Sequence, residues 1–310
     1  MPNRATARRC GALRQLARRS YSIASKRDFA TIAVRFSTCG RRGAAEFSLK
    51  RRHLIELHEQ PWYPRTLREL FQEGLGHAIA ATGMYHHAAP VLGRVIEHTG
   101  ADAILDLCSG AAEPLLDVVD RIDGDAARKP TVVLSDLYPD RPRFERLKAR
   151  HPDRIDFVSE PVDARNVPRD RGLPRVRTMF TALHHFRPNE VRAILADAAL
   201  HADGFAAFEC TGRTWANMLQ TLTLPVASPI VTAFLLRPFR PAQVFYSFVV
   251  PIVPITSTVD GIVSNLRTYT VEELRSIVDS LETRDFEWEV GTVPMPRNTI
   301  RTTYVIGWRR

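Results

Sequence analysis

Five short apolar runs, each followed by small or polar residues, dominate the pattern in the middle of the chain. In order they are AILDL at 103–107, TVVLS at 131–135, IDFVSE at 155–160, VRTMFTAL at 176–183 and GFAAFEC at 204–210. Runs of this length are typical of parallel strands buried on both faces. Helical stretches follow several of them, for example after Pro114 and Pro188. This alternation predicts an α/β fold with a doubly wound, mostly parallel sheet.

The end of the chain adds a helix and two more strands to this pattern. The stretch 270–281 begins with Thr270 and has Glu273 three residues on, which is a capping-box pattern at a helix start. The segments 286–291 and 302–309 then alternate or run apolar in the manner of strands. The sequence therefore predicts seven strands.

The turn after the first run carries the candidate chemistry. Asp106 lies where the strand ends, and the residues after it have little side-chain bulk, so a ligand can approach the backbone closely. These residues are Cys108, Ser109, Gly110, Ala111 and Ala112. A full G-x-G-x-x-G, which would cradle a pyrophosphate, is missing. The turn therefore favours a nucleotide-type cofactor without a pyrophosphate.

In this motif the chain resembles the class I S-adenosylmethionine-dependent methyltransferases, with Cys108, Gly110 and Ala112 at the family's glycine positions. The resemblance covers roughly 85–210 and 265–310, and the wider sequence is similar to a group of largely uncharacterised bacterial members. It implies a Rossmann-like methyltransferase fold, S-adenosylmethionine as cofactor and no metal. The implied cofactor-binding residues are Asp106, Cys108 and Gly110 in the turn, Asp136 for the ribose hydroxyls, and Asp163 and Ala164 for the adenine edge.

Methyl transfer is an in-line displacement, so much of the rate can come from positioning, and a base helps only when the acceptor loses a proton. His184 and His185 follow the fourth run, where the family's acceptor and cofactor meet. We take His185 as the first candidate base; the alternative is a residue that caps or packs the next helix. Glu209 and Arg213, after the fifth run, are candidates for substrate orientation.

The expected organisation has three parts: a basic tail at 1–53, a helical prelude at 54–100, and a methyltransferase domain at 101–310 with an apolar insertion at 214–259. The prelude predicts two helical stretches over 54–82, broken at 60–64. Trp62 and Tyr63 lie in that break. They are candidates for a substrate lid, or alternatively anchors that fix a turn against the core.

The insertion contains two long charge-free stretches, 214–236 and 241–259. Both reach membrane-spanning length, but four prolines and a basic link between them argue against two crossings. An apolar lid over a substrate pocket, or a shallow insertion at a membrane surface, fits better. Either one favours a small hydrophobic acceptor. Asp260 and Arg267 could hold the insertion onto the core.

The net charge of +9 first suggests nucleic acid, but its distribution removes that suggestion. Residues 1–53 hold 14 Lys and Arg against two acids, whereas the other 257 residues hold 29 basic and 32 acidic groups. The basic segment has the composition of a mitochondrial transit peptide; a disordered tail or a start codon placed upstream are the alternatives. Four scattered cysteines fit a reducing, cytoplasmic interior.

The sequence thus predicts a methyltransferase acting on a small hydrophobic molecule, with possible membrane contact through 214–259. A non-catalytic or membrane-associated binding protein on the same fold is the alternative from another class. A nicotinamide-dependent reductase is third, because it requires the phosphate-cradling turn that is missing here.

Overall fold

The structure is a computed structural model that describes residues 49–110, 113–122, 129–223, 240–296 and 299–310. The predictions for the basic segment up to residue 48, for Ala111 and Ala112, and for the middle of the insertion at 224–239 lie outside the described residues. Residues 49–53, predicted as the end of the basic tail, are described and form backbone hydrogen bonds with the rest of the chain.

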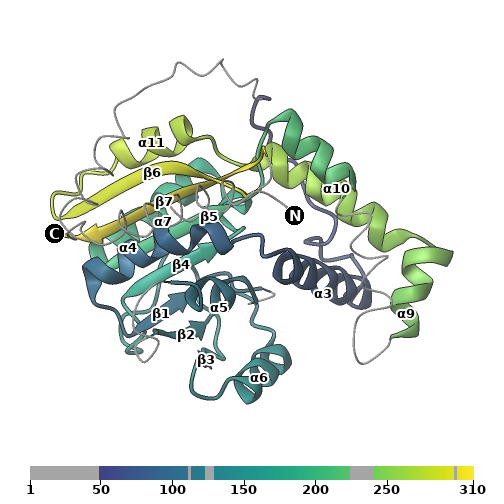
Figure 1. Cartoon of the computed structure of the whole chain (residues 1–310), viewed down its shortest axis with the longest axis horizontal. Helices are drawn as coiled ribbons and strands as arrows, with labels where there is room; N and C mark the ends of the chain where they lie inside the picture. Colours follow the sequence, from purple (N-terminus) through teal and green to yellow (C-terminus); the bar gives the residue numbers. More distant parts are fainter. Residues whose placement is uncertain (1–48, 111–112, 123–128, 224–239, 297–298) are drawn as a thin grey trace, which may run out of the picture. The chain divides into compact units, whose positions relative to one another are not determined.

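Seven strands form one sheet, the number that the sequence predicts, and their order is β3-β2-β1-β4-β5-β7-β6 (Figure 1). The first five strands pair with one another in parallel. β7 runs antiparallel to both of its neighbours, β5 and β6. The strands are β1 (Ala103–Asp106), β2 (Thr131–Leu134), β3 (Ile155–Phe157), β4 (Val176–Phe180), β5 (Gly204–Glu209), β6 (Phe286–Pro294) and β7 (Arg301–Arg309).

Helices cover both faces of this sheet. They are α3 (Arg65–Thr82), η1 (His86–Ala88), α4 (Ala89–Thr99), α5 (Glu113–Val119), α6 (Arg141–Arg150), η3 (Leu183–His185), α7 (Pro188–His201), α9 (Pro241–Val244), η4 (Phe245–Val249), α10 (Ile252–Arg267) and α11 (Val271–Asp279). Because successive strand residues point to opposite faces, Ile104 packs with α4, α5 and α6, whereas Leu105 packs with α7 and α11. The two cores hold the strand ends in fixed positions.

The predicted helix starts are confirmed where a local capping signal exists. Thr270 accepts a hydrogen bond from the backbone N–H of Glu273, and the Glu273 side chain accepts one from the N–H of Thr270. Pro188 begins α7. The first five strands are shorter than the predicted runs, by three residues in β3, which ends at Phe157, and in β4, which ends at Phe180 before η3. β6 extends three residues beyond its predicted end, to Pro294.

The prediction of two helical stretches over 54–82 is wrong for its first half, because only α3 is helical there. Pro61 and Pro64 disfavour a helix through this region. In addition, the backbone N–H groups of Leu57 and His58 donate to the two carboxylate oxygens of Asp260, at 2.6 and 3.0 Å. A tertiary contact therefore replaces the hydrogen bonds that a helix would have made.

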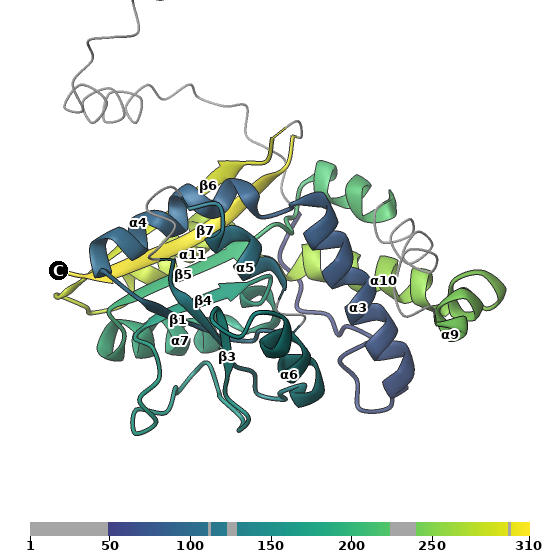
Figure 2. The ribbon, with the colours of Figure 1, turned by 60° about the horizontal axis from the view of Figure 1, so that its bottom comes forward.

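The described part of the insertion is helical. Residues 215–223 form a helix, and α9 with η4 is joined to α10 through Val250 and Pro251. Among the described residues, no single helix is long and apolar enough to cross a membrane; Pro241–Val249 and Ile252–Arg267 pass such a test only as a pair bent by 72°. Figure 2 shows α10 beside α3, and a small core containing Tyr63, Leu67, Leu70 and Val253 joins the two.

Candidate functional site

Backbone strain lies at the carboxyl ends of the two central strands. In the part of the chain that the structure describes, the residues other than glycine with positive φ are Cys108, after β1, and Thr181, after β4. Such conformations are uncommon and concentrate at functional sites. The strand order reverses between β1 and β4, and ligands of doubly wound sheets bind in the crevice at this switch point. The switch point of the strand order and the two strained residues therefore indicate a ligand site at the same edge of the sheet.

The turn after β1 is tied to the end of β2. The backbone N–H of Ser109 donates to the Ser135 carbonyl, 2.9 Å away. Gly110 N–H donates to one carboxylate oxygen of Asp136 at 3.1 Å, and Tyr138 N–H donates to the other at 2.9 Å. Asp136 thus fixes the turn with both oxygens while remaining partly exposed.

Asp106 is buried below this turn rather than open to it. Burial raises its pKa to about 7, although the Thr178 hydroxyl donates to its carboxylate at 2.8 Å. Burial also raises the pKa of the Cys108 thiol, and the carboxylates of Asp136, Asp106 and Asp163 raise it further. Cys108 is therefore a neutral thiol beside a group of acids.

The loop after β3 contributes the last two predicted cofactor residues. Val162 N–H donates to the Asp136 carbonyl at 2.9 Å, which holds this loop against the end of β2. The Asp163 carboxylate accepts hydrogen bonds from the Arg165 side chain, which lower the pKa of Asp163. Ala164 is buried. The loops that carry Asp136 and Asp163 are therefore adjacent and joined by a backbone hydrogen bond.

His184 forms a buried pair with Glu209 at the ends of β4 and β5. Its Nδ1 lies 2.7 Å from a Glu209 carboxylate oxygen, and its backbone N–H donates to the other oxygen at 3.3 Å. Burial alone would lower the pKa of His184, but the carboxylates of Glu209 and Glu56 outweigh burial and raise it. Since Nδ1–H donates to Glu209, Nε2 is the free basic nitrogen of the neutral ring.

His185, the base candidate predicted from the sequence, points to a different partner. Its Nδ1 lies 2.5 Å from a Glu59 carboxylate oxygen, and its side chain is about one third exposed. Burial tends to raise the pKa of Glu59, but His185 and Arg267 lower it to about 2. The two neighbouring histidines therefore have different carboxylate partners, and His185 is the more exposed of the two.

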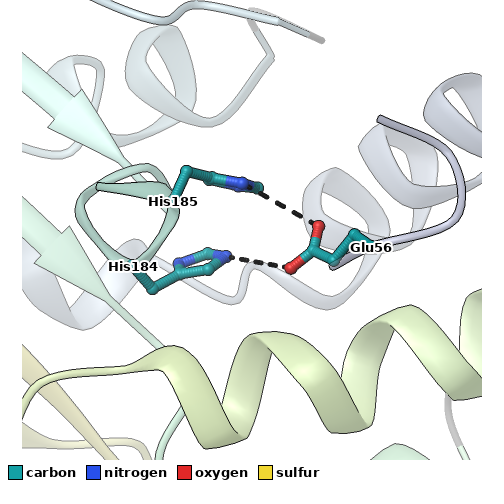
Figure 3. Close-up of side chains that lie close together, drawn as sticks. All are labelled: Glu56, His184 and His185. Atoms are coloured by element: carbon teal, nitrogen blue, oxygen red, sulfur yellow. Dashed lines mark ion pairs between the residues drawn. The ribbon is translucent and has the colours of Figure 1, made fainter. Parts of the chain in front are cut away.

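Glu56 was not predicted from the sequence, and it faces both histidines (Figure 3). One of its oxygens lies 3.9 Å from His184 Nε2 and the other 3.8 Å from His185 Nδ1. Potential ligand atoms of the three residues lie within 4.8 Å of one another, a spacing that could hold a metal ion. However, an Arg267 guanidinium nitrogen lies 3.2 Å from Glu56 and 3.4 Å from His185 Nδ1. Because this cation already compensates the carboxylate, we interpret the group as an ion-paired cluster.

Residues 49–60, which we call the strap, bring Glu56 to this position. The strap runs along α10, where Asp260 binds the backbone of Leu57 and His58 and Arg267 donates to the Leu54 carbonyl at 2.5 Å. Asp260 and Arg267 were predicted to hold the insertion onto the core; the contacts described here join them to the strap instead. Local sequence gave no signal for this contact, because the partners are more than 200 residues apart.

The remaining predicted substrate residues do not converge on His184. Tyr63 is buried, and its hydroxyl donates to Thr256 at 2.9 Å, so it anchors the turn before α3. Trp62 is 66% exposed beside it. Arg213 is buried and lies 2.5 Å from Glu273, which joins the end of β5 to α11. Of the four, Glu209 alone is bonded to His184.

No protein-family model and no curated sequence matches the chain. Similar solved structures include the mitomycin 7-O-methyltransferase MmcR, with 15% identity and a TM-score of 0.44 over 82% of this chain and 59% of that one. PigF with SAH has 16% identity and a TM-score of 0.46, over 82% and 61%. A putative zinc-dependent alcohol dehydrogenase from Rhodobacter sphaeroides has 13% identity and a TM-score of 0.41, over 77% and 98%. The seven-stranded, mostly parallel sheet with helices on both faces is the Rossmann-like α/β fold that the resemblance to the class I S-adenosylmethionine-dependent methyltransferases implied.

Proposed function

We propose that the protein is an S-adenosylmethionine-dependent methyltransferase that acts on a small, hydrophobic acceptor. The observation that carries this proposal is the acid-rich turn at the switch point of the sheet. The carboxylates of Asp106, Asp136 and Asp163 all raise the pKa of the Cys108 thiol. A pyrophosphate would be repelled here, whereas a sulfonium cation would be attracted.

The residues of this edge suit the parts of that cofactor. A carboxylate oxygen accepts two hydrogen bonds, and each Asp136 oxygen has one described backbone donor. One acceptor position on each oxygen is left for the two ribose hydroxyls. The backbone of Gly110 would lie against the cofactor, and Asp163 with Ala164 would border the adenine.

His184 is the base of the proposed reaction. When bound, the cofactor supplies an electrophilic methyl group. The protein would hold the acceptor atom in line with that methyl group, and His184 Nε2 would take the proton that the acceptor loses. The imidazolium that forms would be stabilised by Glu209, which lies 2.7 Å from Nδ1, and by Glu56 on the other side. Such assistance is worth about 10² to 10⁴ in rate when the acceptor atom must lose a proton.

The apolar insertion supports a hydrophobic acceptor. α10, which begins in the insertion, contacts α3 and η3, so it lies next to the segment that carries His184. Residues 241–259 hold no charge, which suits an apolar acceptor better than a charged one. We propose a small acceptor because His184, the proposed base, is buried, which leaves little room for a large molecule.

Calorimetric titration with S-adenosylmethionine and with NADH tests the proposal. We expect the wild type to bind S-adenosylmethionine and not NADH. Asp136→Ala should lose that binding, while Asp156→Ala, which removes an exposed acid from β3, should keep it. Melting temperatures of both variants check that the turn stays folded.

The other outcomes point to other functions. Binding of NADH, or binding of S-adenosylmethionine that is indifferent to Asp136, would overturn the proposal. Binding of the cofactor without methyl transfer to any lipophilic hydroxyl or amine compound would favour the non-catalytic binding protein.

A further inference from the structure

One surface of the insertion exposes large apolar side chains in an unusual concentration. It belongs to η4, the link after it, and the first half of α10. We call it the outer face; it consists of Phe245, Val249, Val250, Ile255 and Val259. Single exposed apolar residues are ordinary, but contiguous apolar patches on a protein surface mark interaction sites.

In α10, Val253 and Val263 are buried, but so are several polar side chains, while Ile255 and Val259 are exposed. A soluble helix buries apolar residues and exposes polar ones. In α10 the buried side chains include Asp260, Asn265 and Arg267, each at most 3% exposed, whereas Ile255 is 57% exposed. The polar groups bond to the strap and to the helix at 215–223. The apolar side chains of the outer face are exposed, so they do not form the covered inner side of a lid.

The shape of the insertion suits the surface of a bilayer better than its interior. The helical segments on either side of Pro251 meet at 72°. α10 has 16 residues and is therefore about 24 Å long, shorter than the roughly 30 Å hydrocarbon layer. Its second half is held by Asp260 and Arg267. In the first half, Val253 and Thr256 face α3 and the turn before it, while Ile255 and Val259 are exposed.

Charge distribution favours lipid over a second copy of the chain. Protein interfaces normally have a polar and charged rim, but residues 241–259 contain no charge at all. Residues 1–47 hold 11 basic and two acidic groups, a balance that equals the whole net charge of +9. An apolar face combined with a basic segment is the usual composition of proteins that bind membrane surfaces.

We propose that the outer face inserts into the interface of a lipid bilayer and holds the protein at a membrane surface. The proposal stands on the exposed residues and does not depend on the proposed activity. The partner it names is a lipid bilayer. If the protein is a methyltransferase, its acceptor can reach the site from the lipid phase.

Vesicle flotation of the full chain tests this inference. The probe is phosphatidylcholine vesicles in about 0.5 M sodium chloride, which screens charges beyond a few ångströms. Under these conditions the basic segment contributes little. We expect the wild type to float with the vesicles, and the double variant Val249→Asp, Ile255→Asp to bind at least about tenfold more weakly, since each change places a charge in the apolar layer. Leu200→Asp is the matched control, because Leu200 is 65% exposed on α7 and should float like the wild type.

Two results would overturn the inference: a wild type that stays with the soluble fraction, or a double variant that floats as well as the wild type. Melting curves show whether the double variant is folded. A dimer in light scattering that the double variant abolishes, together with no flotation, would assign the outer face to contacts between copies of the chain.

Discussion

At the scale of single residues, the environment of His184 decides the chemistry of the site. Its pKa is raised because the carboxylates of Glu209 and Glu56 outweigh burial. A raised pKa means that the native state holds this proton more tightly than the unfolded chain. The stability from the pair is therefore complete below about pH 6.5 and lost as the pH rises through the native pKa.

We predict that the His184 ring titrates above the ordinary histidine range in the wild type, and that Glu209→Gln lowers its pKa. Ring-proton chemical shifts followed by NMR against pH measure this. Glu59→Gln is the matched control: it removes the carboxylate bonded to His185 and should leave His184 close to its wild-type titration. An unchanged His184 pKa in Glu209→Gln would contradict the assigned pair.

A second residue-scale prediction concerns catalysis. With an acceptor that must lose a proton, His184→Gln should lower the rate of methyl transfer about 10² to 10⁴-fold, whereas His185→Gln should lower it far less. The reason is that His184 Nε2 is left free by the bond from Nδ1 to Glu209, while His185 is paired with Glu59. Rate profiles against pH distinguish loss of a base from misfolding. Equal losses in both variants would return His185 to the role predicted from sequence.

Asp106 gives a third prediction, because its pKa of about 7 lies well above the ordinary value of 3.8. The native state then binds the proton more tightly than the unfolded chain, so stability falls as the pH rises from about 4 to 7. Asp106→Asn removes this ionisation, so its free energy of unfolding relative to that of the wild type should rise between pH 5 and pH 8, by roughly 2 to 3 kcal/mol. Urea unfolding at both pH values measures the gain. Asp156→Asn, an exposed acid with a lowered pKa, should show no such gain.

At the scale of elements, the strap is held to α10 by charge and hydrogen bonds. Arg267 is 3% exposed and pairs with Glu56, which is 1% exposed. Arg267→Met would leave a buried carboxylate unpaired, so we predict a loss of roughly 3 to 5 kcal/mol in the free energy of unfolding. Adding Glu56→Gln should recover part of the loss.

Denaturant unfolding and limited proteolysis at residues 49–60 would measure that effect. Arg65→Met, which removes an exposed pair with Glu69, serves as the control and should change neither. If Arg267→Met is as stable as the wild type, the strap is not held in the way the structure shows.

The elements that sequence predicted well are those specified by neighbouring residues. The apolar runs of β1 and β2 and the capping box of Thr270 and Glu273 are local signals, and they were found in place. The strap was missed because Asp260, some 200 residues away, binds its backbone. Glu56 and Glu59 had no local signal at all. For the same reason sequence ranked His185 first: only the fold shows that Glu209 lies against His184.

At the scale of the whole molecule, charge divides the chain at the boundary of its compact unit. Residues 48–310 form one compact unit, and they hold 32 basic and 32 acidic groups, whereas the net charge of +9 resides in residues 1–47. The neutral unit contains both cores, the candidate site and the outer face.

A protein lacking residues 1–47 should therefore keep the melting temperature of the full chain and its affinity for S-adenosylmethionine, because every residue proposed to bind the cofactor lies in the compact unit. It should also still float with phosphatidylcholine vesicles through the outer face. Adding phosphatidylglycerol to the vesicles should strengthen binding of the full chain at low salt, because Lys and Arg of the basic segment are attracted to anionic lipid. The truncated protein should not show this increase. Flotation of both forms with the two kinds of vesicle measures the difference. A truncated protein that unfolds, or that no longer binds S-adenosylmethionine, would show that the basic segment contributes to the fold or the site rather than to the surface on which the protein acts.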